Sequence, residues 1–234
     1  MRSLTTIAFD ADDTLWHNER FFQESQQGFT KLLEEFADPE RIEAELLDAE
    51  RRNIGFYGFG IKGFTLSMLE TATTLCGDRL PPAIVREILS LGKTMLEHPV
   101  ELLPGVVETL QALADRFTLL VVTKGDLFDQ ERKLVQSGLA DHFDHVEIVS
   151  DKTPEVYRRV FDRHGHGPSR GMMIGNSLKS DVLPALEAGC WAVHVPHDLT
   201  WALEHANEPT GHPRYRGVSS LSAIPALVAE LQPE

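Results

Sequence analysis

Basic residues, cysteines and long apolar segments are all scarce in this sequence of 234 residues. Lysine and arginine total 22 against 36 acidic residues, and the formal net charge of −14 argues against broad binding to nucleic acid or to an anionic membrane surface. Cys76 and Cys190 suggest neither a disulfide framework nor a metal-ligand pair, so a reducing cytoplasm is the simplest setting. No apolar run approaches about 18 residues, and the N-terminus lacks a signal-peptide pattern. We therefore expect a soluble, cytoplasmic protein.

The remaining composition is ordinary for a globular chain, with 42% hydrophobic and 25% charged residues. Residues 17–100 repeat apolar side chains at helical spacing with almost no strand pattern, whereas the rest alternates strands and helices with short connections. Such alternation implies a parallel sheet covered by helices on both faces. We predict an α/β protein with a Rossmann-like parallel sheet core, residues 1–16 and 101–234, and an inserted all-helical cap domain, residues 17–100.

The element boundaries follow from apolar periodicity and from glycine and proline positions. In the insertion, helices are expected over about 18–36, 39–53, 65–76 and 82–97, with a glycine- and aromatic-rich stretch, Gly55–Phe64, between the second and third. In the core, strands are expected over 4–9, 117–123, 146–149, 172–174 and 191–195, with an edge strand at 218–219. Helices are expected over 104–116, 128–137, 154–164, 182–188 and 224–231.

The first predicted strand ends in an unusual concentration of acids. Asp10, Asp12 and Asp13 follow the buried run Leu4–Phe9, and Thr14 follows them. Asp10 and Asp12 lie two residues apart, so both side chains can face the same crevice. Three acids within four residues repel one another unless a cation lies among them, and Mg²⁺ prefers carboxylate oxygens. The carboxyl end of a strand in an open α/β sheet is also where ligand sites form.

Polar residues follow three further predicted strands, and they are expected to converge with the acids at one edge of the sheet. These are Thr123-Lys124-Gly125, Asp151-Lys152-Thr153, and Gly175-Asn176-Ser177 with Asp181. Acids, a hydroxyl, a lysine and an acid-plus-amide loop are the groups needed to hold a phosphoryl group and a metal ion while a carboxylate attacks.

In this order, with a helical insertion after the first, the four motifs resemble those of the haloacid dehalogenase (HAD) superfamily, in its phosphatase branch with a helical C1-type cap. The resemblance covers the whole chain. It implies that Asp10 is the nucleophile that forms an aspartyl-phosphate and that Asp12 is the general acid and base. It also implies that Thr123 and Lys152 bind the phosphoryl group, aided by Gly125. Lys124 is a weaker phosphate-binding candidate, for which a solvated side chain is expected.

The same resemblance implies a Mg²⁺ site made by Asp10, the backbone carbonyl of Asp12, and Asp181. Asn176 stands where many relatives have aspartate. Its amide can ligate through its oxygen or hold a metal-bound water, but it adds no charge. Asp13 and Thr14 are expected to support the local structure, with Thr14 orienting the acids. The dehalogenases of the superfamily lack an acid two residues after the nucleophile, so Asp12 favours phosphoryl transfer over carbon–halogen cleavage.

The implied function is Mg²⁺-dependent hydrolysis of a small phosphorylated metabolite, such as a sugar phosphate or nucleotide. A phosphomutase of the same superfamily and a catalytically silent phosphate-binding module remain alternatives, and Lys62 leaves open a phosphonatase that uses a cap lysine. Gly55–Phe64 is the candidate for a substrate-contacting segment of the cap, although its aromatic residues equally suit a cap core. The stretch His197–Tyr215 suggests no function, and the oligomeric state is left open.

Overall fold

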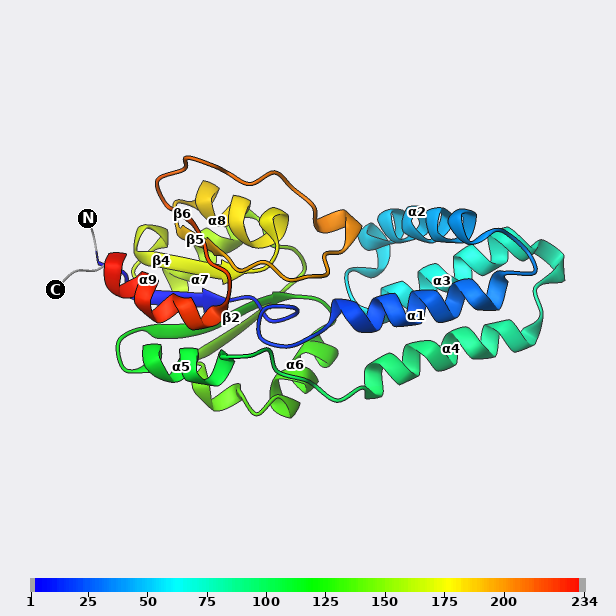
Figure 1. The fold of residues 1–234 in the computed structure, drawn as a ribbon, viewed down its shortest axis with the longest axis horizontal. Coiled ribbons are helices and arrows are strands. Elements are labelled where there is room, and N and C mark those ends of the chain that lie inside the picture. Colours follow the sequence, from blue (N-terminus) through cyan, green and yellow to red (C-terminus); the bar gives the residue numbers. More distant parts are fainter. Residues whose placement is uncertain (1–2, 232–234) are drawn as a thin grey trace. The chain divides into compact units, whose positions relative to one another are not determined.

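A computed structural model describes residues 3–231 and divides them into two compact units (Figure 1). One unit, called the sheet unit here, contains the chain up to Glu19, Val100–Lys124 and the chain from Gln130 onward. The other, called the helical unit, contains Arg20–Pro99 together with the short segment Gly125–Asp129. The helical unit thus takes in a loop that the sequence assigned to the core. That the units are separate domains stays a prediction.

The sheet unit is built on six parallel strands in the order β3-β2-β1-β4-β5-β6. The strands are β1 (Thr6–Phe9), β2 (Thr118–Lys124), β3 (His145–Val149), β4 (Gly171–Gly175), β5 (Trp191–His194) and β6 (Tyr215–Gly217). The helices of this unit are α5 (Val106–Ala114), α6 (Leu127–Gln136), α7 (Pro154–His164), α8 (Leu183–Ala188) and α9 (Ile224–Leu231), of which α6 begins in the segment grouped with the helical unit. The predicted fold class, a Rossmann-like α/β sheet, is confirmed.

Alternating side chains of the central strands enter two separate cores, because successive residues of a strand point to opposite faces. In β1, Ile7 and Phe9 join one apolar cluster with α5 and α9, whereas Ala8 joins a second cluster with α7 and α8. Both faces of β1 are therefore buried, which explains why its sequence is a continuous apolar run rather than an alternating one.

The strand order reverses beside β1. The chain moves outward from β1 to β2 and β3, and then returns to the other side of β1 to form β4. A reversal of this kind separates the loops that follow the two strands, and it is where open α/β sheets bind ligands. The loops after β1 and β4 are therefore the first place to look for a site.

The helical unit contains α2 (Pro39–Tyr57), α3 (Ile61–Cys76), α4 (Pro82–Glu97) and nearly all of α1 (Glu19–Leu33). One face of each helix contributes to a common core, because apolar residues recur at three- and four-residue spacing. The fully buried members of this core are Phe29, Leu33, Ile42, Leu46, Met68, Ala72 and Ile88.

Several predicted elements are confirmed to the residue, and others need correction. Pro82–Glu97, Pro154–His164 and Ile224–Leu231 are helices as predicted. The glycine- and aromatic-rich stretch Gly55–Phe64, placed between two predicted helices, is itself mostly helical, since α2 continues to Tyr57 and α3 begins at Ile61. The edge strand lies at Tyr215–Gly217 instead of 218–219. Cys76 and Cys190 are both free and buried.

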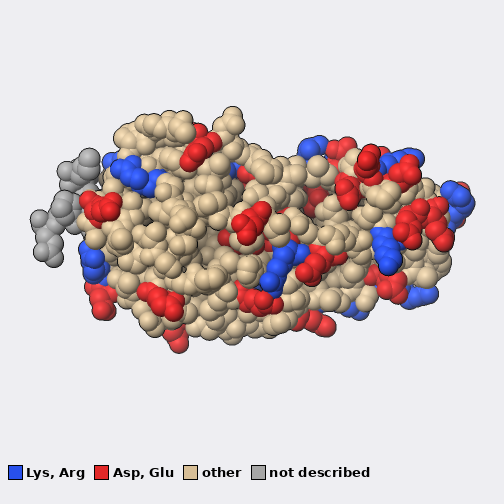
Figure 2. Space-filling view, viewed as in Figure 1, with Lys and Arg blue, Asp and Glu red and all other residues tan. Residues whose placement is uncertain are grey.

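Among residues 3–231, no helix is long and apolar enough to cross a bilayer. On the face of the molecule that Figure 2 shows, lysine and arginine side chains lie among aspartates and glutamates, and the described residues form no continuous basic patch there.

Candidate active site

The loop after β1 is a tight turn held by its own backbone. The amides of Thr14 and Leu15 both donate to the carbonyl of Ala11, and the amide of Asp13 donates to the carbonyl of Trp16 at 2.7 Å. Asp13 has a positive φ of 60°, a conformation that aspartate tolerates better than most residues. The turn begins immediately after Asp10, which places Asp10, Asp12 and Asp13 at the carboxyl end of β1.

Lys152 joins two carboxylates that come from different strand ends. Its ammonium group donates to Asp10 Oδ1 and, at 2.7 Å, to Asp181 Oδ1. All three side chains are buried, and none is more than 9% exposed. Three of the predicted site residues, which follow β1, β3 and β4, are thus brought together in one place.

The pKa values of this group reflect two carboxylates that share one amine. Burial and the neighbouring Asp181 carboxylate raise the pKa of Asp10 from 3.8 to about 7, although Lys152 opposes the shift. Burial disfavours the charge on Lys152, but the carboxylates of Asp10 and Asp181 outweigh burial and raise its pKa above the ordinary value. The site therefore has more negative charge than its one buried lysine neutralises, and a divalent cation between the carboxylates would suit it.

Asp181 reaches the site because Gly175 has no side chain. A Cβ atom at position 175 would lie 2.2 Å from Asp181 Oδ2, so only glycine lets the carboxyl group pack against the end of β4. The residues Leu178–Val182 form one turn of π-helix, a rare element that often marks functional sites. The same oxygen, Asp181 Oδ2, accepts the backbone amide of Ser177 at 2.9 Å, which orients the carboxylate.

Thr14 links the loops after β1 and β4, as expected for a residue that orients the acids. Its hydroxyl lies 3.1 Å from Asp10 Oδ2 and 3.2 Å from Asn176 Oδ1, and it accepts the backbone amide of Asn176 at 3.1 Å. The hydroxyl has a single hydrogen, so it donates to one of the two oxygens at a time. Asn176 thus lies next to the nucleophile candidate.

Asp12 is held by a different set of donors from Asp10. Trp16 Nε1 and Lys133 Nζ donate to Asp12 Oδ1 at 2.7 and 2.8 Å, and Gln130 Nε2 lies 3.2 Å from Asp12 Oδ2. Gln130 also donates to the hydroxyl of Thr123 at 2.6 Å. The amide of Gln130 therefore connects two predicted site residues, Asp12 and Thr123.

Lys124 is not solvated, which corrects the expectation from sequence. Its ammonium group donates to Glu204 Oε1 at 2.5 Å and to the hydroxyl of Ser180 at 2.8 Å. Glu204 Oε2 accepts the hydroxyls of Ser177 and Ser180, each at 2.5 Å. Burial opposes the charge of Glu204, but Lys124 and the two hydroxyls lower its pKa below the usual value. The sequence predicts a solvated Lys124 because nothing in it indicates that Glu204, 80 residues away, is the partner.

Two further predicted residues are placed as follows. Gly125 has a φ of 147°, follows β2 and belongs to the helical unit, so its phosphate-binding role stays a prediction. Lys62, the candidate for a phosphonatase lysine, pairs with Asp126 at 2.8 Å within the helical unit, where the lysine side chain is half exposed.

Sequence reasoning missed Gln130, Lys133 and Glu204. A signal for the first two was present, because they lie three apart in a predicted helix and therefore share a face. Glu204 lies in a stretch without regular periodicity, and no local pattern singles it out.

The fold and the site together define an α/β enzyme with a carboxylate and a lysine at the carboxyl ends of a parallel sheet. The chain belongs to the haloacid dehalogenase-like hydrolase family, whose model matches residues 4–189. It is therefore an enzyme of the hydrolase class, and the resemblance found in the sequence is confirmed.

Among solved structures, a haloacid dehalogenase-like family hydrolase from Xanthomonas campestris has a TM-score of 0.88 and 39% identity, over 98% of this chain and 92% of that one. Among curated proteins, the glyceraldehyde 3-phosphate phosphatase of Methanothermobacter thermautotrophicus is 26% identical over 89% of this chain and 92% of its own length. The pyrimidine 5'-nucleotidase YjjG of Escherichia coli is 27% identical over 55% of this chain and 57% of its own. These relatives support hydrolysis of phosphoric monoesters.

Proposed function

We propose that the protein is a Mg²⁺-dependent phosphatase that hydrolyses a small phosphorylated metabolite through an aspartyl-phosphate on Asp10. The observation that carries the proposal is the buried contact of Lys152 with Asp10 and Asp181 at the reversal point of the sheet. The phosphatase relatives support the substrate class, since their names describe small phosphate esters. We further propose that the helical unit is the cap domain predicted from the sequence.

Each residue has a chemical task in this proposal. The Asp10 carboxylate attacks phosphorus. Lys152 offsets the negative charge of the phosphoryl oxygens, and the Thr123 hydroxyl binds one of these oxygens. Asp12 donates a proton to the leaving oxygen and then takes one from the water that hydrolyses the intermediate. The raised pKa of Asp10 means that the nucleophile needs nearby positive charge to be ionised at neutral pH.

The donors present fit a hard divalent cation. Asp10, Asp181, the backbone carbonyl of Asp12 and the Asn176 amide would hold Mg²⁺, all of them oxygen ligands. When bound, Mg²⁺ supplies further positive charge to the carboxylates of Asp10 and Asp181, which otherwise share the single charge of Lys152. Asp13 keeps its supporting role, because its carboxylate accepts the backbone amides of Asn18 and Glu19.

The test is turnover of p-nitrophenyl phosphate and of a panel of metabolite phosphates, with and without Mg²⁺. We expect Asp10→Asn to abolish turnover, because an amide is a far weaker nucleophile, whereas Asp141→Asn, at an exposed position, leaves it unchanged. Borohydride reduction of acid-quenched enzyme should convert residue 10 to homoserine, which mass spectrometry detects. Normal turnover in Asp10→Asn, or reduction at another residue, contradicts the proposal.

A further inference from the structure

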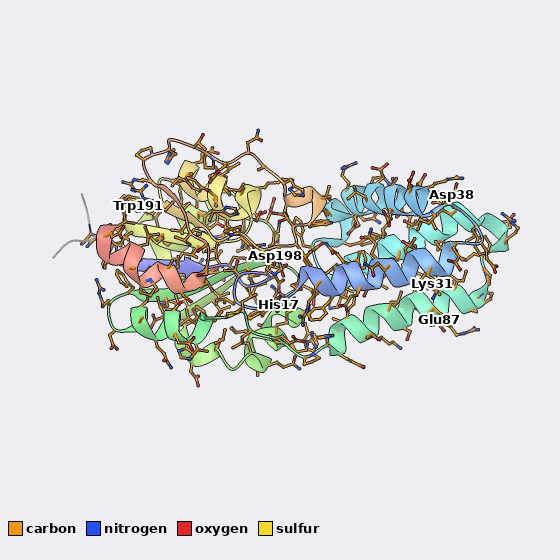
Figure 3. The ribbon with its side chains drawn as sticks, in the orientation of Figure 1. His17, Lys31, Asp38, Glu87, Trp191 and Asp198 are labelled. Atoms are coloured by element: carbon orange, nitrogen blue, oxygen red, sulfur yellow. The ribbon has the colours of Figure 1, made fainter. Side chains whose placement is uncertain are left out.

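A second cluster of metal-binding side chains lies in the sheet unit, apart from the contact of Lys152 with its two acids. It consists of Asp13, His17 and His197, whose ligand atoms all lie within 4.8 Å of one another. Two of them come from the loop after β1 and the third from the stretch after β5, to which the sequence assigned no function. Figure 3 labels His17 and, next to His197 in sequence, Asp198.

The separations match those of ligands around one metal ion. His197 Nε2 lies 3.4 Å from His17 Nδ1 and 3.6 Å from Asp13 Oδ1. Zinc–nitrogen and zinc–oxygen bonds of about 2.0–2.1 Å in a tetrahedron place neighbouring ligand atoms about 3.3 Å apart. Two of the three separations are close to this value, and the third, between the ligand atoms of Asp13 and His17, is at most 4.8 Å.

The groups behind the ligands are those that metal sites use to orient them. His197 Nδ1 lies 3.0 Å from the carbonyl oxygen of Leu199. The backbone amide of Leu199 also lies 3.2 Å from Nδ1 and donates to it when Nδ1 is unprotonated. A metal ion on Nε2, the atom that faces Asp13 and His17, requires the other tautomer, in which Nδ1 carries the hydrogen and donates to the Leu199 carbonyl. The Asp13 carboxylate accepts the backbone amides of Asn18 and Glu19, at 2.8 and 2.9 Å. Both ligands are thus held in place by main-chain groups.

Burial also favours a cation here. The side chains of Asp13 and His197 are only 7% and 10% exposed. A buried carboxylate is costly unless it is paired or coordinates a metal. Two imidazoles and one carboxylate select zinc or another late first-row metal, whereas Mg²⁺ prefers oxygen ligands alone.

We propose that Asp13, His17 and His197 bind a Zn²⁺ ion that fastens the stretch after β5 to the loop after β1. Three protein ligands leave one position of the tetrahedron for water. The ion would tie together two segments 180 residues apart in sequence. The inference stands independently of the proposed phosphatase activity.

The test is a zinc titration of chelator-treated protein against a chromophoric zinc indicator, with excess Mg²⁺ present to occupy all-oxygen sites. We expect one tightly bound equivalent, at least tenfold weaker binding in His17→Gln and His197→Gln, and unchanged binding in His205→Gln, an exposed histidine of the same stretch. Zinc should also raise the Tm of the wild type and of His205→Gln but not of His197→Gln.

X-ray absorption at the zinc edge needs no variant, so it remains decisive if the substitutions prevent folding. Two imidazole ligands in the wild-type spectrum support the proposal. Failure of the wild type to bind micromolar zinc, an all-oxygen spectrum, or wild-type affinity in both His17→Gln and His197→Gln overturns it. None of these readouts depends on phosphatase turnover, so the two proposals fail separately.

Discussion

Removal of the buried amine between Asp10 and Asp181 should destabilise the protein in a pH-dependent way. In Lys152→Met, two carboxylates that are at most 9% exposed lose their shared partner. Leaving a buried charge without its partner costs about 3–5 kcal/mol of unfolding free energy. We expect a loss of this size at pH 8.5, measured by urea denaturation without divalent cations.

The loss should shrink at lower pH because Asp10 takes up a proton. Its folded-state pKa of about 7 lies above the ordinary 3.8, so the folded protein binds more protons than the unfolded chain between these values. The unfolding free energy therefore falls as pH rises through this window. At pH 6.0 Asp10 is mostly neutral, and Lys152 then faces one charged acid instead of two.

We expect the cost of Lys152→Met to be smaller at pH 6.0 than at pH 8.5 by at least about 1.4 kcal/mol, the equivalent of one pKa unit. Both values lie above the sequence pI of about 5.1, which limits precipitation. Lys179→Met is the matched control, since Lys179 is exposed and its ammonium group donates to the carbonyl oxygen of Leu203. Equal losses at both pH values would show that packing of the lysine stem, not charge, explains the effect, and would refute the reasoning.

Two further substitutions test the supports of the site. Gly175→Ala should lower the unfolding free energy by about 1–3 kcal/mol, because its Cβ would lie 2.2 Å from Asp181; an unchanged urea midpoint would mean that Asp181 moves aside freely. Glu204→Gln should cost about 1–3 kcal/mol by removing the carboxylate that pairs with Lys124 at 2.5 Å, and it should expose the stretch around residue 204 to limited proteolysis. A proteolytic pattern identical to that of the wild type would contradict this role of Glu204.

The parallel sheet could be predicted because each central strand is buried on both faces. Burial on both sides produces an uninterrupted apolar run, and a polar residue then marks where the strand ends. Asp10, Thr123 and Asn176 were found in this way, from local sequence alone. The edge strand Tyr215–Gly217 could not be predicted in this way, because two of its residues are only partly buried, Gly217 is exposed, and the three form no apolar run.

The partners of the predicted residues could not be read from the sequence in the same way. The sequence predicts a solvated side chain for Lys124, because its partner Glu204 lies in a distant part of the chain. Gln130 and Lys133 reach Asp12 only because α6 follows β2 and turns one face toward the loop after β1. Such contacts depend on tertiary geometry, which no local periodicity encodes.

Surroundings, more than position in the turn, distinguish Asp10 from Asp12. Asp10 is buried with a second carboxylate and a lysine, and its pKa is raised accordingly. Asp12 is more exposed and accepts an indole N–H and an ammonium group on one oxygen, while Gln130 occupies the other. Two acids two residues apart thus have different electrostatic environments, as an enzyme that assigns them separate tasks requires. In the proposed mechanism Asp12 has to release some of these donors to exchange a proton, so Gln130 and Lys133 are the groups expected to shift when a phosphate ester binds.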